Sequence, residues 1–388
     1  MKNDVVQLGD VVTIARTAAT DVECRSLPFV GLDDIEGDTG EFAESFRRSP
    51  EVVLATKYLF ETSHVLYGKL RPYLNKVVAP NFRGVCTTEI LPLCPKPQTL
   101  DREYLQALLL SRRFVSWASS QVSGANLPRL DPSRLLEYRF SLPCYESQVQ
   151  IGKRIDAIRR MRCQYRVGLS WAEGLLGRVF REMFAVRGSR WPMKTLTELC
   201  ESADDIRCGP FGTQLSVSEL VDAGVPLWGI KHVNSNFREL TDEYLSAEKA
   251  EALSNYNLKP GDIVMTRKGT VGNCALYPSH FPPGVMHSDL LRIRPNTSYI
   301  DPVFLATTLQ NSSEIERQIG LISGGAVMPG VNVGLLKEIS VRVPPIDLQL
   351  RFRGIAKECA DMSSVLAESL RQAEHLFQSM LHEAFGEA

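Results

Sequence analysis

The chain has 388 residues and a mass of 43.3 kDa, which predicts two or three domains. Apolar residues make up 44% and charged residues 23%, a composition unlike that of a disordered or fibrous protein. The formal net charge of −1 excludes a nucleic-acid binder held by bulk positive charge but permits local basic grooves. The sequence lacks a signal-peptide core and an apolar run near the roughly 20 residues of a bilayer span. Its nine cysteines form no CxxC pair, so we expect a cytoplasmic protein.

The first 145 residues have the pattern of a mixed α+β unit. Short β-type runs end at turns, as in residues 63–68, and a helix is expected over residues 101–119. We assign residues 1–145 to a first domain.

Residues 146–187 change pattern and predict one long helix. Apolar side chains recur at alternating intervals of four and three residues from Ile151 to Met183, and no proline interrupts them. Apolar positions at this spacing over more than four heptads are typical of a coiled coil.

The second half of the chain repeats the first. Residues 124–151 match residues 325–352 at a constant offset of 201, which pairs Pro143 with Pro344 and Gln148 with Gln349. Upstream segments match in the same order at offsets of 198 to 200, as small loop insertions would produce. Because the matching segments occur in the same order in both halves, the sequence indicates an internal duplication. Residues 188–346 are therefore a second α+β domain, and residues 347–388 are a second long helix.

The two long helices can be interpreted in two ways. Each could lie as a separate amphipathic helix on its own domain, or the two could pair with each other. A helix of about 38 residues is about 57 Å long, exceeds a 150-residue domain and would expose an apolar stripe if unpaired. We therefore expect an antiparallel coiled coil with the two domains at opposite ends, related by a pseudo-twofold axis.

The heptad positions define the expected helix interface. Its main residues are Ile151, Ile155, Ile158, Leu169, Leu176, Phe352, Leu366, Leu370, Phe377 and Met380. Polar Arg162 and Ser363 occupy equivalent interior positions, and we hypothesise that they fix the register of the pair.

Motifs for catalysis or cofactor binding are missing from the sequence. Gly68-Lys69 is not part of a Walker A motif, and no GxGxxG, D/NPPY-type methyltransferase motif, Asp/Glu-x-Lys nuclease core or HExxH is present. The cysteines do not have zinc-site spacing. We expect no catalytic site, metal or cofactor in this chain.

Polar, glycine-bearing loops at equivalent points of the two halves are candidates for DNA contact. Residues 68–76 combine cations, a tyrosine and an amide, which suit phosphates and base edges, and residues 266–273 supply cations and glycines. For any single residue, a solvated turn is an equal or better interpretation. The candidates are Lys69, Arg71, Tyr73, Asn75, Lys76, Asn126, Arg129, Lys231, His232, Asn234, Arg267, Lys268, Thr270, Asn273 and Ser323.

The chain resembles the specificity subunit of type I restriction–modification systems over essentially its whole length. The resemblance rests on the duplicated architecture and on ordered stretches of sequence. These are LYGKLRPYLNKVVAP (66–80), CTTEILPLCPK (86–96), GDIVMTRKGTVGNCAL (261–276), SDLLRIRPN (288–296) and the two Pro-x-x-x-x-Gln segments at 143–148 and 344–349.

This resemblance implies two target-recognition domains, each reading half of a split double-stranded DNA target and held apart by the two helices. It also implies that the helices dock a methylation subunit, expected in two copies, which carries S-adenosylmethionine and the adenine-methylating site. A restriction subunit can join this complex. Because the loops of the two halves differ, the target is expected to be asymmetric.

Two other classes of protein fit part of the sequence. A stand-alone DNA-binding regulator would bind specific DNA tightly without partners, and the weak net charge argues against it. A coiled-coil scaffold would bind only proteins, and its complexes would keep their DNA affinity after Arg71→Ala or Arg267→Ala.

Overall fold

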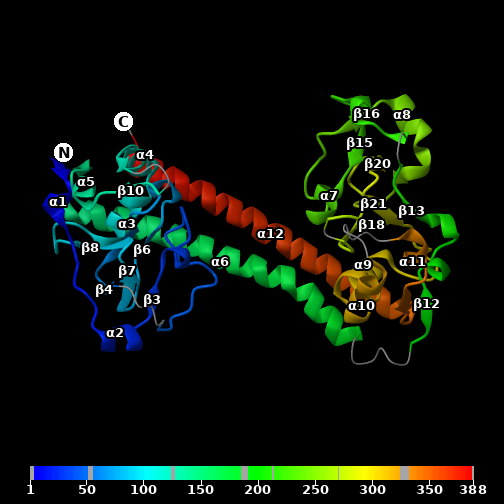
Figure 1. Cartoon of the computed structure of the whole chain (residues 1–388), viewed down its shortest axis with the longest axis horizontal. Coiled ribbons are helices and arrows are strands. Elements are labelled where there is room, and N and C mark those ends of the chain that lie inside the picture. Colours follow the sequence, from blue (N-terminus) through cyan, green and yellow to red (C-terminus); the bar gives the residue numbers. More distant parts are fainter. Residues whose placement is uncertain are drawn as a thin grey trace. The chain divides into compact units, whose positions relative to one another are not determined.

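The computed structural model describes residues 4–50, 56–123, 127–184, 191–211, 214–269, 271–323 and 332–386. The chain divides into two units (Figure 1). Unit 1 comprises residues 1–169 and 365–388, and unit 2 comprises residues 170–364. Helices α6 (Tyr145–Phe184) and α12 (Ile346–Phe385) each contribute one end to each unit. Within the described ranges, no helix carries an apolar stretch long enough for a membrane crossing.

Unit 1 is an α+β unit built on small sheets. Its strands are β1 (Asp4–Gln7), β2 (Val12–Ile14), β3 (Phe29–Val30), β4 (Lys57–Phe60), β5 (Val65–Gly68), β6 (Val77–Val78), β7 (Gly84–Thr87), β8 (Ile90–Pro95), β9 (Val122–Ser123), β10 (Arg129–Leu130) and β11 (Arg139–Leu142). Its helices, besides the ends of α6 and α12, are α1 (Leu8–Val11), α2 (Asp21–Ser26), α3 (Arg102–Leu110), α4 (Arg112–Ser120) and α5 (Pro132–Leu136). The larger sheets have the orders β2-β8-β5-β6 and β3-β7-β4, and β1 pairs with β11.

Unit 2 has the same kind of architecture. Its strands are β12 (Met193–Thr195), β13 (Ile206–Cys208), β14 (Leu220–Val221), β15 (Val225–Trp228), β16 (Tyr244–Leu245), β17 (Asn257–Leu258), β18 (Ile263–Thr266), β19 (Cys274–Leu276), β20 (Gly284–Met286), β21 (Leu290–Ile293) and β22 (Ser340–Arg342). Its shorter helices are α7 (Ile230–Asn234), α8 (Ala247–Ala252), α9 (Pro302–Asn311), α10 (Ser313–Ser323) and α11 (Val333–Lys337).

The strand orders of the two units correspond. The sheet β13-β21-β18-β19 of unit 2 matches β2-β8-β5-β6 of unit 1, and the pair β12–β22 matches β1–β11. In unit 1, β3 runs parallel to β7 within the sheet β3-β7-β4. In the sheet β14-β16-β15-β20-β17 of unit 2, β15 runs parallel to β20 in the same way. The expected duplicated α+β architecture is confirmed.

The helical region expected over residues 101–119 consists of two helices in the structure. Ser111 has extended backbone angles between α3 and α4. Its hydroxyl donates to the Leu108 carbonyl and accepts the Phe114 N–H, which caps the second helix. Unit 2 has the same break, where α9 ends at Asn311 and α10 begins at Ser313.

A buried glutamine joins each long helix to its own unit. In unit 1, Gln148 accepts the Asp101 N–H at 3.0 Å and donates to the Pro143 carbonyl at 2.9 Å. In unit 2, Gln349 accepts the Asp301 N–H at 2.8 Å and donates to the Pro344 carbonyl at 2.8 Å. Asp101 and Asp301 cap α3 and α9. The Pro-x-x-x-x-Gln segments of the sequence therefore fix the start of each long helix against the first helix of its unit.

The two long helices pack against each other in an antiparallel sense. In unit 1, the last turns of α12 lie beside the first half of α6, and the Arg162 guanidinium stacks 4.3 Å from the Phe377 ring centroid (Figure 1). In unit 2, the start of α12 meets the end of α6, and the ring centroids of Phe180 and Phe352 are 5.7 Å apart. The expected pairing is confirmed, and each end of the pair also joins the core of its unit.

The heptad residues face inward along both helices. Ile155, Phe352 and Phe377 are buried, and the other expected interface positions are buried or half-buried: Ile151, Ile158, Leu169, Leu176, Leu366, Leu370 and Met380. Arg162 is also buried, and burial lowers the pKa of its guanidinium. Ser363 is half-buried. Their role in setting the register stays a prediction.

Replacing the buried glutamines tests how the long helices are anchored. We expect Gln349→Leu to lower the free energy of unfolding, because it leaves the Asp301 N–H and the Pro344 carbonyl without partners at a cost of about 1–3 kcal/mol each. Urea unfolding measures the loss. Gln164→Leu, at an exposed position of α6, is the matched control and should change stability by less than about 0.5 kcal/mol. Equal stability of the two variants would contradict the anchoring role.

Candidate nucleic-acid interface

The unit 1 basic turn, defined as residues 69–76, presents an arginine and a tyrosine to solvent. Arg71 is exposed and has a left-handed backbone conformation, with φ of 51°, and its N–H donates to the Pro128 carbonyl at 2.7 Å. Tyr73 is 54% exposed in a short 3-10 helix over residues 72–74. Lys69 is half-buried, and its backbone bonds to Glu89 and Leu130 at 3.0 Å each. The turn is therefore fixed by its backbone while two of its side chains stay accessible.

Asn75 and Lys76 in the same turn face the protein. Asn75 is 3% exposed, and its amide donates to Asp38 Oδ1 and to the Leu110 carbonyl. The prediction that Asn75 contacts DNA is therefore wrong, because its polar group serves the fold. Lys76 is largely buried, and its ammonium donates to the Leu32 carbonyl at 2.6 Å.

Arg129 is brought next to this turn by an antiparallel bridge between Leu70 and Arg129. Its guanidinium is half-exposed and pairs with Glu89 at 3.1 Å. Asn126 lies outside the described residues. Arg71, Tyr73 and Arg129 thus form one accessible group of side chains in unit 1.

The unit 2 basic turn, residues 267–273, occupies the equivalent place after β18. The Arg267 N–H donates to the Asp289 carbonyl at 2.8 Å, and its guanidinium lies 4.8 Å from the ring centroid of half-exposed Phe211. Lys268 is exposed and pairs with Asp289 at 2.8 Å. Gly269 and Gly272 have positive φ angles of 70° and 86°, which side-chain-bearing residues rarely adopt. Thr270 lies outside the described residues.

Helix α7 packs beside this second turn. The Asn273 amide donates to Asn234 Oδ1 at 2.8 Å, which links the turn to the end of α7. Lys231 is exposed and forms an ion pair with Asp242. Ser323 is the last residue of α10, and its side chain lies outside the described part of the chain.

His232 is a core residue, so the prediction that it contacts DNA is wrong. It is 1% exposed, its Nδ1 accepts the Gly229 N–H at 2.9 Å, and its ring meets Trp228 edge to face. Burial lowers the pKa of His232, and the nearby Lys231 charge acts in the same direction. Both effects favour the neutral form of the ring.

An acidic residue supports the basic turn in each unit. Glu89 and Asp289 correspond in the repeat, and each accepts a turn N–H through its carbonyl while its carboxylate pairs with a cation. The sequence analysis did not predict that these two acidic residues support the turns, although their equivalent positions in the repeat could have indicated it. Phe211 was also missed, since one aromatic residue in a glycine-rich loop does not stand out.

The arrangement offers cations, an accessible aromatic ring and amides on two separate turns. Cations suit backbone phosphates, whereas arginine and asparagine can also read base edges. No cluster of His, Cys, Asp and Glu in the described ranges could hold a metal ion. The geometry therefore supports binding to a polyanion.

The pH dependence of stability tests the burial of His232. An unfolded histidine has a pKa near 6.5, whereas the pKa of His232 in the folded protein is lower. Below pH 6.5 the unfolded chain therefore binds a proton that the folded chain does not, and the free energy of unfolding falls as the pH falls. We expect His232→Gln to show a shallower loss of stability than the wild type between pH 6.5 and 5, by at most about 1.4 kcal/mol per pH unit.

Urea unfolding at several pH values measures this difference. The exposed Gln164 on α6 supplies the control, since Gln164→Leu removes no titratable group and should keep the pH dependence of the wild type. The same pH dependence in His232→Gln and the wild type would show that the ring is free to protonate in the fold.

Two α+β units of matching strand order, each carrying a basic turn, define a duplicated protein with two candidate binding surfaces. No family model matches the chain. The type I restriction enzyme EcoDI specificity subunit of Escherichia coli is 26% identical over 153 residues. That match covers 39% of this chain and about a third (34%) of that relative.

Solved structures of type I restriction–modification proteins share the fold over almost the whole chain. The S subunit from M. genitalium matches with a TM-score of 0.67 and 13% identity, covering 99% of this chain and 96% of that one. A chain from a study of type I complex assembly and conformational transition matches with a TM-score of 0.58 and 16% identity, covering 98% and 97%. The resemblance seen in the sequence is confirmed, and the chain has the fold of type I specificity subunits.

Proposed function

We propose that this chain is the DNA sequence-specificity subunit of a type I restriction–modification complex. The observation that carries the proposal is the duplication of one α+β unit with an accessible basic turn at the same place in each copy. Each unit reads one half of a bipartite target through its own turn. Because Arg71 and Tyr73 in unit 1 correspond to a turn with Arg267 and two glycines in unit 2, the two half-sites differ.

The long helices support a target with an unread spacer. Each has 40 residues, which corresponds to about 60 Å, whereas one turn of B-DNA is about 34 Å. Two reading units joined by such helices can contact segments of DNA that are not adjacent. The base pairs between them then contribute no direct contacts.

The helices also supply a surface for the partner subunits. Trp171 on α6 is 67% exposed, and the Arg178 guanidinium lies 5.5 Å from its ring centroid. Exposed tryptophan and arginine side chains are typical anchors of protein interfaces. We assign this surface to a methylation subunit, in two copies, and a restriction subunit can join the complex.

The chemistry of methylation belongs to that partner. S-adenosylmethionine and the adenine-methylating site are placed on the methylation subunit, and this chain contributes DNA recognition without catalysis. The sequence lacks the methyltransferase and nuclease motifs that a catalytic role would need. The complex acts in the cytoplasm, where its DNA substrate is found.

Two alternative functions make different predictions. A stand-alone regulator would bind its DNA target tightly in the absence of any methylation subunit. A protein scaffold would assemble complexes whose DNA affinity does not depend on either basic turn. The accessible cations at equivalent points of both units favour the specificity subunit over the scaffold.

Changing one turn at a time tests the assignment of half-sites. We expect Arg71→Ala to relax the sequence requirement in one half of the target and Arg267→Ala to relax it in the other half. A bidentate contact between arginine and guanine contributes about 1–3 kcal/mol of discrimination, so affinity for the intact target should fall at least about fivefold. Sequencing of methylated sites and DNA-binding titrations, both with the co-expressed methylation subunit, measure these effects.

Arginines outside the turns provide matched controls. Arg134 in unit 1 and Arg238 in unit 2 are both exposed, and Arg134→Ala and Arg238→Ala should leave the methylated motif unchanged. Arg71→Lys keeps the charge but loses the bidentate geometry, so it should retain phosphate affinity and still relax the motif. An unchanged motif and unchanged affinity in both turn variants would favour the scaffold.

A further inference from the structure

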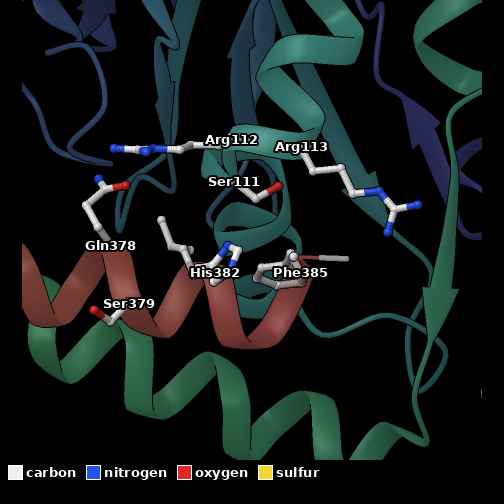
Figure 2. A pocket seen from close by; sticks show the side chains of 9 residues that line it. Ser111, Arg112, Arg113, Gln378, Ser379, His382 and Phe385 are labelled. Atoms are coloured by element: carbon white, nitrogen blue, oxygen red, sulfur yellow. The ribbon is translucent and has the colours of Figure 1, made fainter. Parts of the chain in front are cut away.

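A pocket of about 260 Å³ lies in unit 1, between the start of α4 and the last turns of α12 (Figure 2). Ser111, Arg112 and Arg113 line it from the α4 side. Gln378, His382 and Phe385 line it from α12. Figure 2 shows Arg112 extending on the Gln378 side and Arg113 on the opposite side, with His382 and Phe385 facing Ser111. The described lining combines the apolar side chains of Leu381 and Phe385 with basic and other polar groups.

The described lining of this pocket is basic. Among the described residues that line it, two are arginines and one is a histidine, and none is an aspartate or glutamate. Among the described residues, neither Arg112 nor Arg113 has an ion-pair partner. Other arginines of unit 1, such as Arg83 and Arg159, each pair with two carboxylates. Two arginines without a described ion-pair partner, whose side chains extend to opposite sides of one pocket, favour an anionic ligand there (Figure 2).

Helix α4 adds to the positive potential at the same point. It has nine residues and begins at Arg112, with the Ser111 hydroxyl accepting the Phe114 N–H at 3.3 Å. The backbone N–H groups of the first turn and the helix dipole place partial positive charge at the helix start. The helix start therefore adds partial positive charge beside Ser111, which lines the pocket.

The equivalent position in unit 2 lacks these features. The backbone bond from Val115 to Ser111 corresponds to the bond from Glu316 to Ser312, which fixes an offset of 201 between the two helices. At this offset, Ser313 and Glu314 replace Arg112 and Arg113, and Glu314 pairs with Arg342 at 3.2 Å. The basic pair is thus specific to unit 1 and is not required by the duplicated fold.

The pocket lies beside the unit 1 basic turn. The Asn75 amide at the end of the turn donates to the Leu110 carbonyl, one residue before Ser111. The 3-10 helix that carries Tyr73 packs directly on α4, and the Phe114 ring on α4 meets Tyr67 at the end of β5. A nucleic acid held by Arg71 and Tyr73 therefore approaches the same layer of the protein as Arg112 and Arg113.

We propose that this pocket binds a phosphate group of the DNA backbone and positions the duplex for the unit 1 basic turn. The proposal rests on the proposed function and adds a contact that carries no sequence information. A guanidinium can donate two parallel hydrogen bonds to phosphate oxygens, so either arginine at this helix start suits such a ligand. The neighbouring turn favours a DNA phosphate over an acidic segment of a partner protein.

The salt dependence of DNA binding tests the proposal. The probes are a fluorescent duplex that carries the methylated target and one that lacks it, and the protein is the full chain with its methylation subunit. We expect Arg112→Ala with Arg113→Ala to weaken binding to both duplexes by about tenfold at 0.1 M salt. The slope of log K against log salt should become less steep by about 1, while the ratio of the two affinities stays constant.

Three further variants separate a built phosphate site from general electrostatics. Lys153→Ala with Arg154→Ala removes two exposed charges from α6 in the same unit and should have a much smaller effect. Gln378→Glu places a carboxylate at the pocket and should reproduce the loss. Arg112→Lys with Arg113→Lys keeps the charge but loses the bidentate geometry, so it should recover only part of the affinity.

Several results would overturn the proposal. Equal losses from the α6 variant and the pocket variant would show that only total charge matters. Normal DNA binding by the pocket variant, with loss of the methylation subunit, would assign the pocket to an acidic protein segment. The wild-type complex reports separately on the proposed function, because failure to prefer the target duplex would reject that function whatever the pocket variants do.

Discussion

The structure depends on a pair of buried glutamine side chains. The side chains of Gln148 and Gln349 each accept the N–H of a helix-capping aspartate and donate to a proline carbonyl. Each glutamine lies in the first turn of a 40-residue helix. A buried amide with two such partners is costly to break, so the direction in which each long helix leaves its unit is fixed. The antiparallel pairing of α6 and α12 follows, since each helix starts in one unit and ends in the core of the other.

The duplication provides one scaffold with two different reading surfaces. Strand order, the helix break at Ser111 and its counterpart, and the acidic support of the basic turns are the same in both units. The accessible side chains differ: unit 1 presents Arg71 and Tyr73, whereas unit 2 presents Arg267 with Phe211. The arginines at the start of α4, which have no described ion-pair partner, extend this asymmetry, because Ser313 and Glu314 stand at the equivalent positions of unit 2.

Features that repeat along the sequence could be predicted, and features that depend on single tertiary contacts could not. The heptad pattern and the repeat at an offset of 201 each extend over many residues. The paired helices and the duplicated α+β units could therefore be predicted from the sequence. The burial of Asn75 and His232 depends on individual partners, Asp38 and the Gly229 N–H, which no local pattern reveals. Likewise, the sequence does not indicate that Arg112 and Arg113 begin a helix and line a pocket, because this depends on the break at Ser111 and on the end of α12 lying beside them.

The central claim is that this chain confers sequence specificity on a methyltransferase. Single-molecule sequencing of DNA tests it directly, in cells that express the methylation subunit with and without this chain. Modified adenines that appear only with the chain, in an asymmetric motif of two parts, are the predicted result. Full methylation in the absence of the chain would contradict the account, because the methyltransferase would then find its target unaided.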